Sequence, residues 1–191
     1  EEIVVNNDIS YFLPKLGQPL RCPFFMASFE YTMEKKMEKL FWGGCSCGAV
    51  RYTISDKPIF TQACHCMLCR KYTASAFIVH SFIETVKFKL ETGTLFETDG
   101  PTGSGRGQKV SRCKVCADQI YSIFNRVKGK ITTLKTTTLD RAEDFPPQAQ
   151  IFTKDKLSWV QLADIPAYDE YYKFNETLSI ESLERWKATG L

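Results

Sequence analysis

The sequence contains no run of about 18 consecutive apolar residues, the length that a membrane-spanning helix needs. It also has little excess charge, because 25 basic and 22 acidic side chains leave a net charge of +3. Such a balance gives no general attraction to nucleic acid or to an anionic membrane, and the basic residues are not gathered into stripes. We therefore expect neither a membrane nor a nucleic-acid partner.

Several familiar motifs are also missing. Gly103, Gly105 and Gly107 form a glycine-rich run, but their spacing and context do not match the dinucleotide or phosphate-loop fingerprints. We read residues 99–107 as a flexible hairpin loop, with closure over a substrate as the second reading. No repeat of solenoid length occurs, and strands do not alternate with helices. The N-terminus begins with Glu1 and Glu2 and carries no basic segment or clear cleavage site, so we expect a cytoplasmic protein.

The composition suits one ordinary domain with an appendage, since 43% of the 191 residues are hydrophobic and 25% are charged. β-Branched and aromatic residues predict strands at 49–54, 76–82, 86–91, 94–97, 119–124 and 131–137. Helix is expected only in short pieces, after Cys66 and near 179–187. The sequence thus predicts a mainly β domain with few short helices.

We divide the chain into an N-terminal extension (1–40), a β domain (41–170) and a partly helical C-terminal tail (171–191). Within the extension, residues 29–40 have the pattern of a short amphipathic helix, with Met33, Met37 and Leu40 on one stripe. Packing on the domain is the first interpretation of this extension. A homodimer contact or a lid is the second.

Cysteine is the abundant reactive residue, with eight in the chain. Seven of them fall in three clusters: Cys45 and Cys47; Cys64, Cys66 and Cys69; Cys113 and Cys116. Disulfides within Cys45/Cys47 or Cys64/Cys66 would be strained, because only one residue separates the two partners. The clusters therefore favour metal binding, and we expect Cys22 to be a free thiol.

Zinc prefers four ligands in a tetrahedron, and seven thiolates do not form two closed four-cysteine sites. The natural division is four plus three, which implies two zinc ions per chain. Both two-cysteine clusters, Cys45 with Cys47 and Cys113 with Cys116, combine into one closed structural site. The remaining cluster of three would leave one position open, as in catalytic zinc sites.

The sequence is compatible with an open and with a closed second site. Cys22, His65 or His80 could supply a fourth ligand and make the site inert. Arg70, Lys71 and Arg112 are candidates for binding a substrate carboxylate, and each could equally be a solvated surface charge. Tyr72 and His80 are possible proton carriers.

The motifs together resemble the glutathione-dependent formaldehyde-activating enzyme (GFA) family, and are similar to centromere protein V-type proteins with a GFA domain. The resemblance rests on GGCSCGAVRY, on CHCMLCRK followed by SAF, on the paired CxxC, on TTLD and on QIFTKDKLSWVQLAD, and covers about residues 41–170. It implies the β-tent fold, with a structural zinc on Cys45, Cys47, Cys113 and Cys116 and a catalytic zinc on Cys64, Cys66 and Cys69. One departure concerns the residue after the last CxxC, usually Gly in the family. Here it is Ala117, which predicts that a position with positive φ is absent or shifted.

The resemblance implies a carbon–sulfur lyase or synthase acting on a thiol adduct, of the kind that joins formaldehyde to glutathione. Our hypothesis is that a thiol bound at the open zinc position becomes a thiolate near neutral pH. The thiolate then attacks an aldehyde, or leaves during C–S cleavage. The alternative is a non-catalytic zinc scaffold or interaction module with the same fold.

Overall fold

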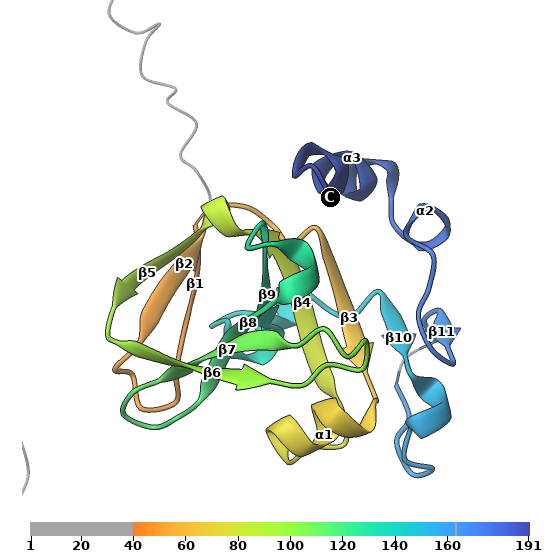
Figure 1. Ribbon diagram of the computed structural model, residues 1–191, viewed down its shortest axis with the longest axis horizontal. Coiled ribbons are helices and arrows are strands. Elements are labelled where there is room, and N and C mark those ends of the chain that lie inside the picture. Colours follow the sequence, from red (N-terminus) through yellow and green to blue (C-terminus); the bar gives the residue numbers. More distant parts are fainter. Residues whose placement is uncertain (1–39, 163) are drawn as a thin grey trace, which may run out of the picture. The chain divides into compact units, whose positions relative to one another are not determined.

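The computed structural model describes residues 40–162 and 164–191, which form two β-sheets and a few short helices (Figure 1). The expectation of a mainly β fold with few helices is confirmed. The helix expected at 29–40, the free thiol of Cys22 and the dimer contact fall almost wholly outside the described residues. Among the described residues, no helix has the length and hydropathy needed to cross a bilayer. The domain boundaries at 40 and 170 stay a prediction.

The smaller sheet has the strand order β1–β2–β5 and is antiparallel throughout. Its strands are β1 (Phe41–Gly44), β2 (Arg51–Ile54) and β5 (Phe88–Thr92). The larger sheet has the order β11–β10–β3–β4–β9–β8–β7–β6. Its strands are β3 (Phe60–Cys64), β4 (Ile78–Glu84), β6 (Leu95–Gly100), β7 (Gln108–Cys113), β8 (Gln119–Phe124), β9 (Ile131–Lys135), β10 (Ala149–Ile151) and β11 (Ala167–Tyr168).

The strand β3 is buried along its whole length, because it lies between β4 on one side and β10 on the other. It pairs antiparallel with β4 and parallel with β10. A strand with neighbours on both sides is fixed in register, since both its ladders must match. Its last residue, Cys64, is therefore held firmly where the helix α1 (Met67–Thr73) begins (Figure 1).

The main core packs the two sheets against each other. Tyr52 of β2 is fully buried with Ile120 of β8 and Leu134 of β9. The Tyr52 hydroxyl still finds a partner, because it lies 2.7 Å from Thr138 Oγ1. Cys45 and Cys113 belong to the same buried cluster. The four-cysteine site is thus continuous with the core.

Each predicted strand has a counterpart, and β8 has the predicted bounds. The strand predicted at 131–137 ends earlier, at Lys135, where a 3₁₀ turn begins. The short helices predicted after Cys66 and near 179–187 are confirmed as α1 and α3 (Ile180–Ala188). The prediction missed β1, β3, β7, β10 and β11. Of these, β7 follows directly on the glycine-rich loop, whose composition hid the strand.

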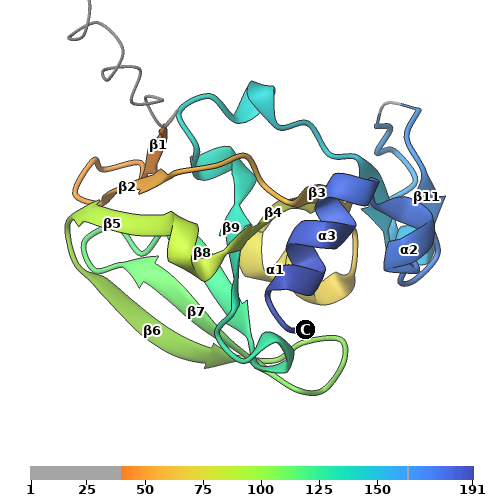
Figure 2. The same cartoon turned by 90° about the horizontal axis from the view of Figure 1, so that it is seen from above.

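The C-terminal segment shares a core with the larger sheet (Figure 2). Trp186 of α3 packs edge-on against Phe82 of β4 and against Phe174 of the short helix α2 (Phe174–Thr177). Arg185 forms two hydrogen bonds with the Glu84 carboxylate, of 2.7 and 2.9 Å. Since both side chains are largely buried, this pair fastens α3 to β4.

Replacing Arg185 by methionine should destabilise the protein by about 2 kcal/mol, because buried Glu84 loses both charge-assisted hydrogen bonds. Urea denaturation of the metal-loaded protein measures the change. Lys173→Met is the matched control, since Lys173 pairs with Glu176 on the exposed surface; we expect a change under about 0.5 kcal/mol there. Equal effects of the two substitutions would show that the Arg185–Glu84 pair does not fasten α3.

Candidate metal centres and cavity

The structure brings together four cysteines from two distant turns. Cys45 and Cys47 follow β1, whereas Cys113 ends β7 and Cys116 lies in the next turn. All four sulfurs lie within 4.8 Å of one another, and the Sγ–Sγ distances are 3.4 Å for Cys45–Cys47 and 3.9 Å for Cys47–Cys113. A tetrahedron with Zn–S bonds of ~2.3 Å has edges of ~3.8 Å. The donor set therefore fits one zinc ion.

Backbone amides donate hydrogen bonds to two of these sulfurs. The Val50 amide donates to Cys45 Sγ at 3.2 Å, and the Val115 amide donates to Cys113 Sγ at 3.4 Å. Burial acts to raise the pKa of Cys45, but the Val50 amide and the neighbouring thiols lower it to about 6. Asp118 links the two turns, because its carboxylate accepts the Ser46 amide at 2.7 Å. These contacts stabilise a thiolate on Cys45.

The backbone conformation of Ala117, the residue after the last CxxC, differs from the one that the sequence predicts. We predicted that replacing Gly by Ala would remove or shift a position of positive φ. Instead Ala117 itself adopts φ = +63°, and its amide donates to the Cys113 carbonyl at 2.9 Å. That prediction was wrong: the turn keeps its left-handed residue, and Ala accepts the strain because the surrounding cysteine cluster fixes the turn.

The second cluster forms where β3 passes into α1. Cys64 ends the strand, Cys66 caps the helix N-terminus and Cys69 lies in the first turn. The three sulfurs lie within 4.8 Å of one another. Hydrogen bonds from the Cys64 and Cys69 thiols lower the pKa of Cys66, and the Cys69 amide also donates to Cys66 Sγ at 3.4 Å. This cluster could hold a metal ion with three protein ligands.

The described side chains that could have closed this second site do not do so. His65 is buried with Nε2 3.2 Å from Gln150 Oε1 and its ring beside Phe77, so it points away from the sulfurs. Of the three sulfurs, His80 has a hydrogen-bond contact with that of Cys69, at 3.6 Å between Nε2 and Sγ, but it does not join the group of ligand atoms within 4.8 Å of one another. Cys22 lies outside the described residues. The fourth side of the cluster faces a cavity.

That cavity has a volume of about 460 Å³, and all three cysteines of the second cluster line it. Much of its wall is aromatic and includes Tyr72, Phe124, Tyr172 and Trp186, the last two from the C-terminal segment. The Tyr172 hydroxyl donates to Gln62 Oε1 at 2.6 Å, which ties the segment to β3. An aromatic wall of this kind excludes water from a bound substrate.

The glycine-rich loop forms one rim of this cavity through residues 101–104. Gly100, just before the loop, lies directly beneath Tyr72: a Cβ added there would come within 2.0 Å of the tyrosine hydroxyl oxygen. Any other residue at this position would force the Tyr72 side chain to move. The loop therefore lies beside the cavity, as a loop that closes over a substrate would have to. Closure itself stays a prediction.

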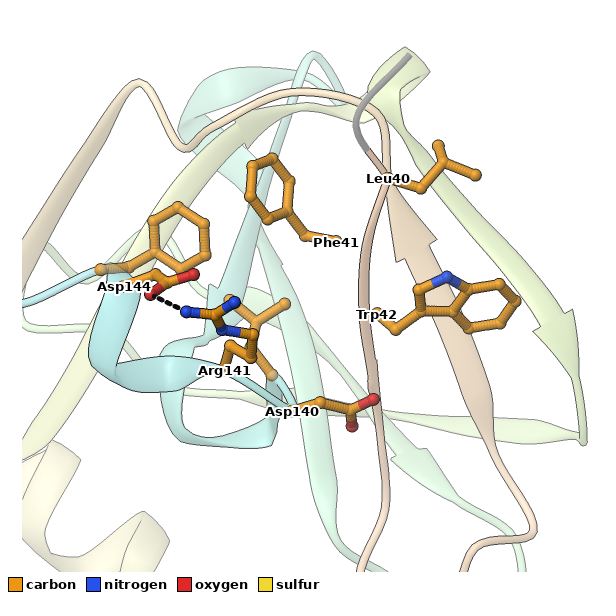
Figure 3. A pocket seen from close by; sticks show the side chains of 8 residues that line it. Leu40, Phe41, Trp42, Asp140, Arg141 and Asp144 are labelled. Carbon is orange, nitrogen blue, oxygen red and sulfur yellow. Dashed lines mark hydrogen bonds and ion pairs between the residues drawn. The ribbon is translucent and has the colours of Figure 1, made fainter. Parts of the chain in front are cut away.

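A second cavity of about 260 Å³ lies away from the cysteines, between the start of β1 and residues 139–145. Figure 3 shows Trp42 beside it and Arg141 hydrogen-bonded to Asp144. The described residues that line it include no cysteine or histidine. The chemistry suggested by the thiolates belongs to the larger cavity.

Only some of the residues predicted to act on a substrate line the large cavity. Tyr72 and His80 line the large cavity, but Arg70, Lys71 and Arg112 are not among its described lining residues. Arg112 donates instead to the Ala117 carbonyl at 3.2 Å. The cationic side chains that do line the cavity are Arg126, exposed in the turn after β8, and Lys135, buried on β9.

Sequence reasoning missed both cations. Arg70 and Lys71 are candidates for substrate binding because they are near the cysteines in the sequence. Lys135, in contrast, is 66 positions after Cys69 and reaches the cavity through strand pairing. A lysine at the end of a strand pattern is most often solvated, and the segment 131–135 carries no polar alternation that would have shown Lys135 to be buried. Only the β4–β9 register reveals that it faces the cavity.

Comparisons with known proteins identify the family of this chain. The sequence profile of the family described as "glutathione-dependent formaldehyde-activating enzyme" matches residues 40–155, more than half of the chain. No curated protein matches. Three chains of solved structures match; one is a Rhodobacter sphaeroides structural-genomics protein, with 16% identity, a TM-score of 0.41, and coverage of 66% of this chain and 98% of that one. A TM-score below 0.5 gives that likeness no weight. By its sequence profile, the chain belongs to the glutathione-dependent formaldehyde-activating enzyme family.

Proposed function

We propose that the protein is a zinc-dependent carbon–sulfur lyase that makes and breaks the adduct between formaldehyde and a thiol of the glutathione type. One observation carries the proposal: three cysteine sulfurs converge on one side of a cavity large enough for a substrate, and no described fourth side chain closes the cluster. Structural zinc sites are closed by four protein ligands, so a three-cysteine cluster beside a cavity is not the arrangement expected of a scaffold.

The seven cysteines divide between two zinc ions in this proposal. Cys45, Cys47, Cys113 and Cys116 would hold a structural ion, and Cys64, Cys66 and Cys69 a catalytic one. When bound at three thiolates, zinc lowers the pKa of a thiol at its fourth position. Both sites need reduced cysteines, which agrees with a cytoplasmic location.

The chain's own residues would orient the thiol substrate. The aromatic side chains contributed by the C-terminal segment cover its apolar atoms. Arg126 is exposed at the cavity and is suited to a carboxylate of a glutathione-like molecule, because a guanidinium binds carboxylates with two parallel hydrogen bonds. Arg70, Lys71 and Arg112 remain candidates for a carboxylate that extends beyond the described lining.

The test mixes the zinc-loaded protein with formaldehyde and glutathione and follows exchange between the free thiol and its hydroxymethyl adduct by NMR. We expect two tightly bound zinc ions per chain and exchange well above the spontaneous rate. With 2-mercaptoethanol, which has no carboxylate, acceleration should be weaker. A single bound zinc and no acceleration with either thiol would instead identify a non-catalytic zinc scaffold.

A further inference from the structure

Lys135 is a cation buried on the wall of the reaction cavity. It is 4% exposed, at the end of β9, and pairs in register with His80 of β4. Its Nζ lies 3.1 Å from Ser122 Oγ of β8 and 3.3 Å from His80 Nδ1. Three adjacent strands thus direct polar atoms to one point, and His80 Nε2 in turn lies 3.6 Å from Cys69 Sγ.

No carboxylate accompanies this lysine. None of the ion pairs formed by the described residues involves Lys135, and the described lining of the cavity contains no Asp or Glu. A buried ammonium without a paired carboxylate is expensive, so the amine either loses its proton or faces an anion that comes and goes. A structural lysine would gain nothing from either arrangement.

We propose that Lys135 is the acid–base residue of the thiol–aldehyde condensation, taking the proton of the incoming thiol and returning it to the aldehyde oxygen as the C–S bond forms. This inference rests on the proposed function. It gives the reaction a proton carrier inside the same cavity as the three sulfurs.

The steps balance without any further reactant. The neutral amine of Lys135 removes the thiol proton, which leaves a thiolate and an ammonium. The thiolate's electron pair forms the C–S bond to formaldehyde while the C=O π electrons move to oxygen. The ammonium then gives its proton to that oxygen, and the product is the S-hydroxymethyl thiol. Lys135 ends as it began, and the reverse sequence cleaves the adduct.

The surroundings set the pKa of the Lys135 amine so that it can both accept and donate a proton. Burial lowers the pKa of Lys135 to about 7; Cys69 and Cys64 act to raise it, while Arg112 of β7 acts to lower it further. An acid–base group works best when its pKa is near the working pH. His80, the other titratable neighbour, is held neutral, because burial and Lys135 lower its pKa well below the usual value.

The test compares wild type, Lys135→Met and Lys89→Met, all zinc-loaded. Lys89 lies exposed on β5, pairs with Glu91 and is not among the residues that line the cavity. In the wild type, kcat/KM for glutathione and formaldehyde should rise as pH increases through about 7. Lys135→Met should lower kcat/KM about 10²-fold and remove this pH step, with both zinc ions retained. Lys89→Met should behave as wild type.

A second readout is independent of turnover. Trace acetylation of the zinc-loaded wild type with acetic anhydride, read by peptide mass spectrometry, should show the reactivity of Lys135 rising with a midpoint near pH 7. If the reactivity of Lys135 has no midpoint near pH 7, or if Lys135→Met keeps its rate or its pH step, the inference is overturned and the proposed function stands. If the wild type does not accelerate the exchange at all, the proposed function falls and the inference with it.

Discussion

Replacing Cys113 by serine should unfold the domain. The Cys113 sulfur is one of four that converge from distant turns, and its side chain belongs to the main core. A structural zinc contributes about 10–16 kcal/mol in small zinc domains, which matches or exceeds the total stability of about 5–15 kcal/mol typical of folded proteins. Loss of one thiolate therefore removes most of the folding free energy. Circular dichroism and zinc analysis of the purified variant would measure this.

Chelation gives the matched experiment without a mutation. A strong chelator that strips both ions from the wild type should produce the same loss of β structure, and added zinc should restore it. A Cys113→Ser protein that keeps a cooperative thermal transition at the wild-type temperature would show that the four-cysteine cluster does not stabilise the fold.

The second large effect is expected at Cys66 and concerns activity without unfolding. This cysteine is only partly buried, lies outside the main core and lines the cavity. Cys66→Ser should leave the β structure intact, reduce zinc from two ions to one, and lower the exchange rate more than about 10²-fold. Even residues that merely support metal ligands cost 10- to 100-fold, so a ligand should cost more.

The two cysteine variants control for each other, because each removes one sulfur from one cluster. Unfolding by Cys113→Ser with retained folding in Cys66→Ser assigns the structural role to the first cluster. Full activity in Cys66→Ser would contradict a catalytic role for the second cluster, and unfolding of Cys66→Ser would show that both clusters are structural.

The grouping of the cysteines could be predicted because it depends on simple chemistry. Thiolate number, ligand spacing and the preference of zinc for four ligands led to the four-plus-three division, and the sulfurs are grouped that way in the structure. The expectation that His65 points away also agrees with its contact to Gln150. Such local rules need no knowledge of how distant strands pair.

The cavity could not be predicted, because its walls come from residues that only tertiary structure brings together. Lys135 reaches it through the β4–β9 register, and Trp186 through the packing of α3. The sequence predicts only a partly helical tail at 171–191, since nothing in its pattern shows which surface its aromatic residues cover. Proximity along the chain favoured Arg70 and Lys71 for the same reason, although neither lines the cavity.

The four-cysteine cluster also has a consequence for how the chain folds. Cys47 and Cys113 are separated by 66 positions, and the loop between them contains residues 64–69. Closing such a loop costs about 4 kcal/mol in chain entropy, beyond a constant, and slows folding when strand pairing alone must overcome it. A metal ion that closed the loop early would bring Tyr52 and Ile120, core residues 68 positions apart in the sequence, close together along the linked chain. The cavity lined by Cys64, Cys66 and Cys69 would be complete only once Trp186, which lies beyond that loop, packs against Phe82 of β4.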